Sequence, residues 1–177
     1  MAGEVTFQMT EADYVAANRD WFLRTILKRK AIIRHAVALG VAFMAGAVLA
    51  GGDRGTFAMG QLWYGLALAG AAAGALLLLY VVTYALIPRR AGRLFRQQTG
   101  FHRPLRFSWS DDGMTQTSAH GTGTYAWRDL HRWTVGRDAI MPYVTDQLYF
   151  VIPRRALSES QVSDLVNTLE RSGLSQY

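Results

Sequence analysis

Few side chains of this 177-residue sequence have the types and spacing that catalysis requires. Ser118 and His120, with Asp111 or Asp112 nearby, supply the residue types of a Ser-His-Asp hydrolase. The sequence has no Gly-x-Ser-x-Gly segment to hold a nucleophilic serine on a strained turn. The two adjacent carboxylates fall in a predicted turn and face different ways, so they do not make a glycosidase pair. We expect these residues to form turns, and we expect no enzymatic activity.

Metal and cofactor sites are also not indicated. The four histidines form no HxxxH or HExxH pattern and have no acidic cluster beside them: His35, His102, His120 and His131. The absence of cysteine excludes disulfides, cysteine-ligated zinc, iron–sulfur clusters and a thiol nucleophile. The two-glycine fragment Gly121–Gly123 fits a hairpin turn better than a phosphate loop. We expect no metal, no cofactor and no small-molecule substrate.

Two long uncharged segments dominate the first half of the chain. Residues Ala36–Gly52 and Gly55–Pro88 carry no charge. Over the whole chain, 18% of the residues are charged and 50% are hydrophobic. A bilayer core needs about 20 apolar residues. A soluble helical hairpin would need a polar face on each helix, and neither segment has one. We predict a transmembrane hairpin over residues 31–88, with spans at about 32–52 and 57–87 joined by a polar turn at 51–55.

The basic residues flank this hairpin. Six lie in residues 1–35 and six in residues 89–106, while only Arg54 lies between the two spans. Because cytoplasmic loops carry the excess of Lys and Arg, we expect a two-pass membrane protein with both termini in the cytoplasm. We name seven of these residues the basic collar: Lys28, Arg29, Lys30, Arg34, Arg89, Arg90 and Arg93. The collar either binds anionic headgroups or only fixes orientation during insertion.

The net charge of +6 is not spread over the chain. Six basic and four acidic residues give residues 1–35 a charge of +2, and six basic residues alone give residues 89–106 a charge of +6. Residues 107–177, with six basic and eight acidic residues, have a charge of −2. A nucleic-acid binder needs a basic face on its folded part, so we exclude nucleic acid as a partner.

Small residues recur at helical spacing in both predicted spans. Ala42, Gly46 and Ala50 are four residues apart in the first, and Gly70 and Gly74 form a GxxxG pattern in the second. Such patterns allow helix backbones to approach closely in lipid. Two uses are open: packing of the two helices against each other, or association with a second copy or another membrane protein.

The remaining segments predict an α+β organisation. Residues 1–30 contain a short strand at Val5–Met9 and an amphipathic basic helix that Thr10 caps, residues 89–103 form a basic juxtamembrane segment, and residues 104–177 form a cytosolic β domain. With the N-terminal strand we count about seven antiparallel strands. A capping box at Ser158–Gln161 opens a final amphipathic helix that Gly173 ends. Strands closed by one C-terminal helix are the layout of pleckstrin-homology-like domains.

The order of these features resembles a bacterial family. The N-terminal strand and acid-rich helix start (Val5–Tyr14), the basic helix, the two-span hairpin, Trp127–Leu130 and the Leu148–Leu157 segment are together similar to the YcxB-like proteins of bacteria. The resemblance implies a bacterial cytoplasmic-membrane protein with a cytosolic C-terminal β domain. It implies no established activity and no catalytic residues.

These observations lead to one principal functional hypothesis. The chain is a non-catalytic inner-membrane protein whose cytosolic β domain mediates protein interaction, as an adaptor, accessory subunit or regulator of a membrane complex. The first alternative is a sensor of anionic lipid headgroups at the cytoplasmic leaflet. Two further alternatives are a small hydrolase that uses Ser118 and His120, and a transporter or channel subunit that oligomerises through Gly70 and Gly74.

Overall fold

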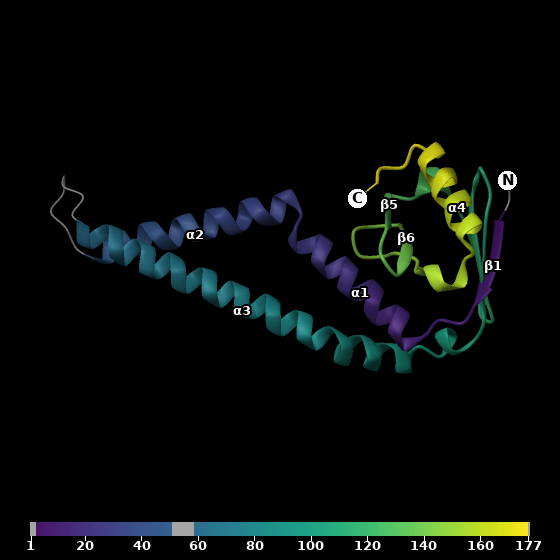
Figure 1. The fold of residues 1–177 in the computed structure, drawn as a ribbon, viewed down its shortest axis with the longest axis horizontal. Helices are drawn as coiled ribbons and strands as arrows, with labels where there is room; N and C mark the ends of the chain where they lie inside the picture. The colour runs from purple at the N-terminus through teal and green to yellow at the C-terminus, as the bar shows by residue number, and fades with distance from the viewer. Residues whose placement is uncertain (1–2, 51–58, 177) are drawn as a thin grey trace. The chain divides into compact units, whose positions relative to one another are not determined.

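The chain folds as two compact units (Figure 1). The structure is a computed structural model and describes residues 3–50 and 59–176. We call the first unit, Met1–Asp20 with Ile87–Tyr177, the β unit, and the second, Trp21–Leu86, the hairpin unit. The β unit is therefore built from the two chain segments that flank the hairpin unit. Each unit is described below by itself.

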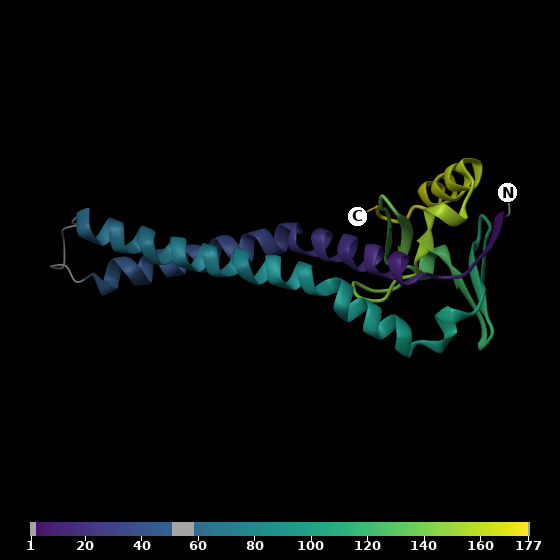
Figure 2. The same ribbon diagram turned by 60° about the horizontal axis from the view of Figure 1, so that its bottom comes forward.

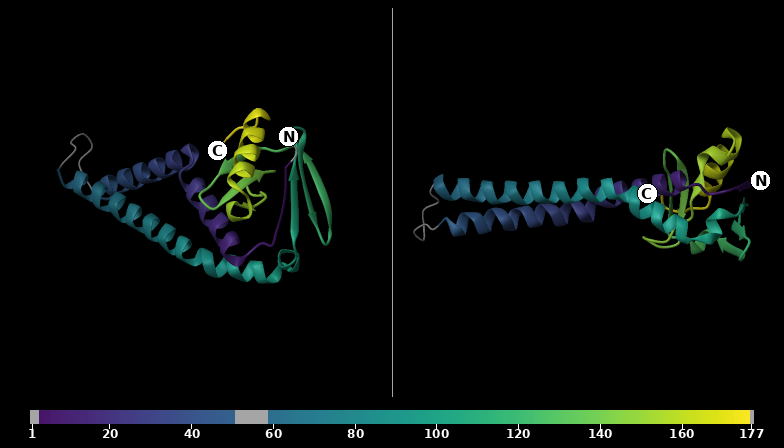
Figure 3. Two further views of the ribbon diagram at one scale, coloured as in Figure 1. Left: turned by 45° about the vertical axis from the view of Figure 1, so that its right-hand side comes forward. Right: turned by 90° about the horizontal axis from the view of Figure 1, so that it is seen from below.

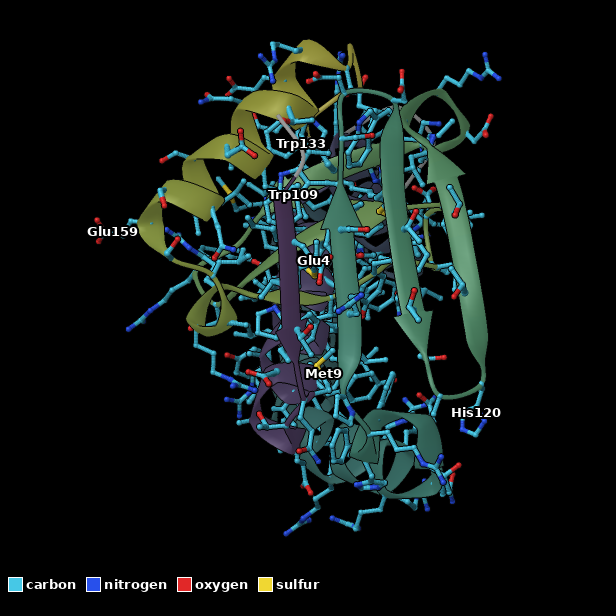
Figure 4. All side chains as sticks on the ribbon, turned by 90° about the vertical axis from the view of Figure 1, so that its right-hand side faces the viewer. Glu4, Met9, Trp109, His120, Trp133 and Glu159 are labelled. Atoms are coloured by element: carbon cyan, nitrogen blue, oxygen red, sulfur yellow. The ribbon has the colours of Figure 1, made fainter. Side chains whose placement is uncertain are left out.

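A four-stranded antiparallel sheet forms one layer of the β unit (Figure 4). Its strand order follows the sequence: β1 (Gly3–Phe7), β2 (Leu105–Trp109), β3 (Gly113–Ser118) and β4 (Gly121–Ala126). The N-terminal strand β1 pairs with β2 over its whole length, from Gly3 opposite Trp109 to Phe7 opposite Leu105. The sheet is therefore complete only when residues from before the hairpin join residues from after it.

A second antiparallel sheet and a helix complete the β unit. The sheet has the order β5 (Arg132–Val135), β6 (Ala139–Tyr143) and β7 (Ile152–Pro153). Three short 3-10 helices and one α-helix connect or follow the strands: η1 (Thr99–His102), η2 (Trp127–Asp129), η3 (Arg154–Ala156) and α4 (Glu159–Arg171). Figure 3 shows α4 beside the two sheets. The expected α+β organisation, with seven strands and a C-terminal helix, is confirmed within the described residues.

The core of the β unit follows from strand alternation. In β2, Leu105, Phe107 and Trp109 are buried, while Arg106 between them is exposed. Their side chains join a single cluster with residues of β1, both sheets and α4, including Trp133, Ile140, Leu165 and Leu169. The Trp109 indole N–H donates to the Asp164 carboxylate of α4 at 2.8 Å, so the buried ring keeps its polar atom satisfied.

Capping residues set the helix ends in the β unit. Thr10 begins α1 (Glu11–Ile26): its hydroxyl accepts the Asp13 N–H at 3.2 Å, and Asp13 accepts the Thr10 N–H at 2.8 Å. Ser158 and Gln161 form the predicted capping box of α4. Gly173, with φ of 75°, follows that helix in the left-handed region that glycine tolerates.

The hairpin unit consists of long apolar helices. These are α2 (Arg29–Leu49) and α3 (Met59–Gln97). The residues of α3 from Ile87 onward belong to the β unit. α2 and α3 approach each other near the C-terminal end of α2 and the N-terminal end of α3 (Figure 2). At the other end of the unit, the His35 ring nitrogen and the Tyr80 hydroxyl are hydrogen-bonded at 2.6 Å, and the Phe22 ring lies 6.1 Å from that of Tyr80.

Two helix boundaries differ from the prediction. The basic helix expected to run to about residue 30 ends at Ile26, and α2 begins separately at Arg29, after Lys28 with a non-helical ψ of 137°. The break contains no proline or glycine. The predicted turn at 51–55 and the start of the second span at 57 lie outside the described residues.

The expectation for the strand that follows β6 is wrong. The apolar residues of Leu148–Ile152 predict one strand that ends before Pro153, yet β7 contains only Ile152 and Pro153. A proline within a strand predicts an edge or a bulge at Pro142, but β6 is the middle strand of its sheet. The Pro142 carbonyl accepts the Phe150 N–H at 2.9 Å, so its missing donor faces that irregular segment and interrupts the ladder there.

Candidate functional site

The basic collar is solvent-facing on its two helices. Arg29, Lys30 and Arg34 are exposed on α2, and Lys28 just before them is half-buried. On α3, Arg89, Arg90 and Arg93 are exposed, and their spacing of three and four residues places Arg93 beside both others. The two groups belong to different units, so their convergence at one membrane depth stays a prediction.

Glycine contacts in the hairpin unit separate the predicted small residues into two groups. A Cβ on Gly46 would lie 2.5 Å from the Tyr64 carbonyl oxygen, and a Cβ on Gly65 would lie 2.9 Å from the Phe43 ring. These two glycines therefore allow the close approach of α2 and α3. A Cβ on Gly70 or Gly74 would meet no atom within 4 Å in the described part of the chain.

The hairpin-packing interpretation thus fits Gly46 and does not fit Gly70 and Gly74. Ala42 and Ala50, which flank Gly46 at the same spacing, are half-buried. The sequence analysis missed Gly65, because nothing in its neighbours distinguishes it from the other small residues of α3. Association through Gly70 and Gly74 stays a prediction.

An arginine clamp, formed by Arg155 and Asp13, joins the two segments of the β unit. Arg155 Nε donates to Asp13 Oδ1 at 2.9 Å, and Nη2 donates to Asp13 Oδ2 and to the Gln8 carbonyl oxygen, the latter at 2.9 Å. The Asp13 side chain is 10% exposed, and that of Arg155 is 50% exposed. Burial alone would raise the pKa of Asp13, but the hydrogen bonds from Arg155 and Thr10 outweigh it and lower that pKa.

The two segments that carry the family resemblance have structural roles. Trp127 and Leu130 are buried, and the Trp127 indole N–H donates to the Ser110 carbonyl at 2.8 Å. Ile152 and Pro153 are buried, and Arg155 supplies the clamp. These segments hold the β unit together.

A cluster of aromatic and charged side chains lies on β5, β6 and the segment after them. The Arg132 guanidinium lies 5.1 Å from the centre of the Tyr143 ring and pairs with Asp146, which also lies 3.6 Å from His131. The Tyr149 ring lies 5.2 Å from that of Tyr143. Burial is the main cause that raises the pKa of the Tyr149 hydroxyl, which therefore stays protonated. The sequence analysis missed this cluster because its members come from separate segments.

The candidate hydrolase residues do not converge. The Ser118 hydroxyl donates to the Gly121 carbonyl and accepts the His120 N–H, both at 3.2 Å, so it belongs to the β3–β4 turn. Asp111 precedes β3 and pairs with Arg171 at 3.1 Å. The length of β3, at roughly 3.3 Å per residue, separates Asp111 from Ser118. Within the described residues, no group of three or more His, Asp or Glu side chains could hold a metal ion.

The outward face of the four-stranded sheet is a polar surface. We call it the threonine face, and two rows of paired residues cross it: Glu4, Ser108, Thr115 and Thr124; and Thr6, Arg106, Thr117 and Thr122. The Thr115 and Thr124 hydroxyls lie 3.1 Å apart, and Thr122 donates to Thr117 at 3.2 Å. In Figure 4 this face is turned toward the viewer, with the β3–β4 turn at His120.

Together these features define a class of protein: a small two-sheet β unit with a terminal helix, interrupted by two long apolar helices. Residues 109–169 match the YcxB-like protein family, so the chain carries a YcxB-like domain over these residues. The resemblance predicted from the sequence is confirmed there. The match begins at Trp109, the last residue of β2, and does not include β1 or α1. Comparison with curated proteins and with solved structures gave no match.

Proposed function

We propose that this chain is a two-pass protein of the bacterial inner membrane whose β unit lies in the cytoplasm and mediates protein interaction. It would act as an adaptor, accessory subunit or regulator of a membrane complex, without catalysis of its own. The arrangement of four and three strands followed by a C-terminal helix supports a pleckstrin-homology-like fold for the β unit.

The observation that carries the proposal is the pairing of β1 with β2. Residues before and after the hairpin unit form one sheet, so both must lie on the same side of any membrane that the hairpin crosses. Two spans return the chain to the side where it started. The topology inferred from the basic residues and the topology required by the sheet therefore agree.

The surface of the hairpin unit supports a lipid environment. α2 and α3 are long and apolar enough to cross a membrane, and α2, with 21 residues, spans about 31 Å at 1.5 Å per residue. Large apolar side chains such as Val41, Leu49 and Leu77 are 63%, 80% and 65% exposed. In water such a surface would be unfavourable, whereas acyl chains would cover it. The excess of Lys and Arg at the hairpin ends supports cytoplasmic termini.

The threonine face supports a role in protein interaction. It presents short, branched hydroxyl side chains and one ion pair, between Arg106 and Glu4 at 2.9 Å. Over β3 and β4, where the residues of this face are all threonines, a partner can contact the sheet without moving long side chains.

Topology can be measured because the natural chain has no cysteine. In intact cells, a membrane-impermeant maleimide should leave Ser175→Cys unlabelled and label Gly55→Cys, since the first should face the cytoplasm and the second the opposite side. After permeabilisation, both should be labelled. Labelling of Ser175→Cys in intact cells would contradict the proposed orientation.

The interaction role can be tested by photo-crosslinking in native membranes. A benzophenone amino acid at Thr115, on the threonine face, should give a defined protein adduct identifiable by mass spectrometry. The same group at Asn167, which is exposed on α4, is the matched control and should not give that adduct. Equal or absent adducts at both positions would contradict a specific interaction at this face.

The exposure of the basic collar favours a second function, recognition of anionic headgroups. Each base near the surface of an anionic leaflet adds about 1 kcal/mol of attraction. The test compares the thermal stability of the full chain in nanodiscs with and without anionic lipid. The triple change Arg89→Gln, Arg90→Gln and Arg93→Gln should remove the lipid effect. The control triple at exposed arginines outside the collar, Arg128, Arg137 and Arg154, should not.

A further inference from the structure

The edge strands of the two sheets differ in whether other parts of the chain cover them. At β1, Gln161 Nε2 donates to the Glu4 carbonyl at 2.9 Å, and just beyond the strand the Arg155 guanidinium donates to the Gln8 carbonyl. At β5, the Trp133 N–H donates to the Ser175 carbonyl of the C-terminal segment at 3.1 Å. Other parts of the chain thus cover the open sides of β1 and β5.

The β4 edge has no comparable cover. Half of the backbone groups of a strand point away from its neighbour, and β4 has β3 as its only neighbour in the sheet. In the described residues, no backbone hydrogen bond other than those of the β3–β4 ladder ends on residues 121–126. In Figure 4, β4 forms the margin of the sheet on the side away from α4.

The sequence of this hairpin lacks the usual protection of an edge strand. Proteins commonly place lysine, proline, a bulge or an inward charge on an exposed edge to prevent strand pairing. Residues 113–126 contain no Lys, Arg, Asp, Glu or Pro, and β3 and β4 pair without a bulge. The edge therefore stays competent to accept another strand.

The uncharged edge favours a second copy of this chain over a different partner. When a strand pairs with its own copy about a twofold axis, like residues meet near the axis, so any charge on it would repel itself. β4 carries no such charge, and it also lacks the charges that would select a foreign strand. The side chains nearest the edge, Thr122 and Thr124, are small enough to lie opposite each other.

We propose that β4 pairs antiparallel with β4 of a second copy, so that two four-stranded sheets join into one. This inference rests on the proposed function, because it names the partner that the β unit binds. The rows of the threonine face would continue from one copy to the next. Thr122 and Thr124 can bond across the junction because a hydroxyl that donates once can also accept twice.

The test uses full-length chains in membranes. Thr124→Cys, on β4, and the control Asn167→Cys, on α4, are treated with a short homobifunctional maleimide. A spacer of about 8 Å spans directly opposite and diagonal cross-strand neighbours. The proposal predicts a crosslinked dimer for Thr124→Cys and monomer for Asn167→Cys. Equal dimer yields for the two variants would overturn it.

Charge exchange then tests whether the partner is the same edge. In differently tagged chains that carry a cysteine at Thr122, Thr124→Lys alone and Thr124→Glu alone should each reduce the dimer yield about fivefold or more, because like charges meet across the axis. A mixture of the two should restore it. The control, Ser163→Lys, is exposed on α4 away from both the β4 edge and the threonine face, and it should leave the yield unchanged. Failure of the mixture to recover would overturn the proposal.

The two proposals fail in different ways. If β4 gives no dimer while the photo-crosslinker at Thr115 captures a different protein, self-pairing is wrong and the interaction role stands. If β4 gives no dimer and Thr115 captures nothing, both are wrong.

Discussion

Replacement of Arg155 by alanine should destabilise the β unit, whereas replacement of its neighbour Arg154 should not. Arg155 holds Asp13 and the Gln8 carbonyl, which belong to the N-terminal segment. Arg154 is exposed and its side chain is not part of the clamp, although its backbone N–H donates to the Asp138 carbonyl. The two variants remove the same side chain from adjacent positions, so they differ only in the clamp.

The expected loss is about 2 kcal/mol in the free energy of unfolding. A hydrogen bond to a charged group contributes roughly 1.5–3 kcal/mol. The clamp has several such bonds, but the Arg155 side chain is 50% exposed, and solvent reduces the value of a pair of this kind. In a unit of about 110 residues, about 2 kcal/mol corresponds to a decrease in Tm of roughly 8 °C.

The pH dependence gives a second readout of the same contact. Because the pKa of Asp13 is lowered in the folded state, its stabilising contribution is present above the unfolded pKa of about 4 and decreases as pH falls through the folded pKa. The Tm difference between the parent and Arg155→Ala should therefore have its full value of roughly 8 °C at pH 7 and should decrease below about pH 4.

Thermal unfolding followed by tryptophan fluorescence is the appropriate assay. Trp109, Trp127 and Trp133 are buried in the β unit and report on its core. If Arg155→Ala unfolds within about 2 °C of Arg154→Ala at pH 7, the clamp does not stabilise the unit and the argument from its geometry is wrong.

Three further changes have defined outcomes. The fully buried Thr134 hydroxyl has no hydrogen-bond partner among the described residues, so Thr134→Val should raise the Tm of the β unit, by about 1 kcal/mol in stability, and a lower Tm would contradict this. Gly46→Ala should destabilise the packed helices by roughly 1–3 kcal/mol and so lower the melting temperature of the helical circular-dichroism signal in detergent, whereas Gly70→Ala should not. Equal effects of the two changes would show that Gly46 is not needed for the contact between α2 and α3. Trp109→Phe should cost about 1–2 kcal/mol in urea unfolding because the Asp164 carboxylate loses its donor, and a neutral result would show that this bond contributes nothing.

Sequence periodicity and capping were sufficient to predict most of the β unit. The alternation of Leu105, Phe107 and Trp109 fixed β2, and the Thr10 and Ser158 caps located the starts of α1 and α4. These signals are local, because one strand face or one helix turn determines each of them.

What the sequence did not predict depends on contacts between distant segments. Arg155 and Asp13 are 142 positions apart, and neither residue alone indicates a partner. Gly65 and Gly70 look equivalent in the sequence, and only the packing of α2 on α3 distinguishes them. The shortness of β7 follows from which side of β6 the missing N–H of Pro142 faces, which periodicity does not contain.

Removal of the hairpin is the most direct test that the β unit is built from the two chain segments on either side of it. Residues 1–20 joined to residues 87–177 by a flexible linker of about 20 residues retain both segments of the unit. This chain should unfold in one cooperative transition of tryptophan fluorescence. Residues 104–177 alone lack β1, leave Phe107 and Trp109 uncovered, and should show no such transition. Equal unfolding temperatures for the two chains would contradict a unit built from both flanks of the hairpin.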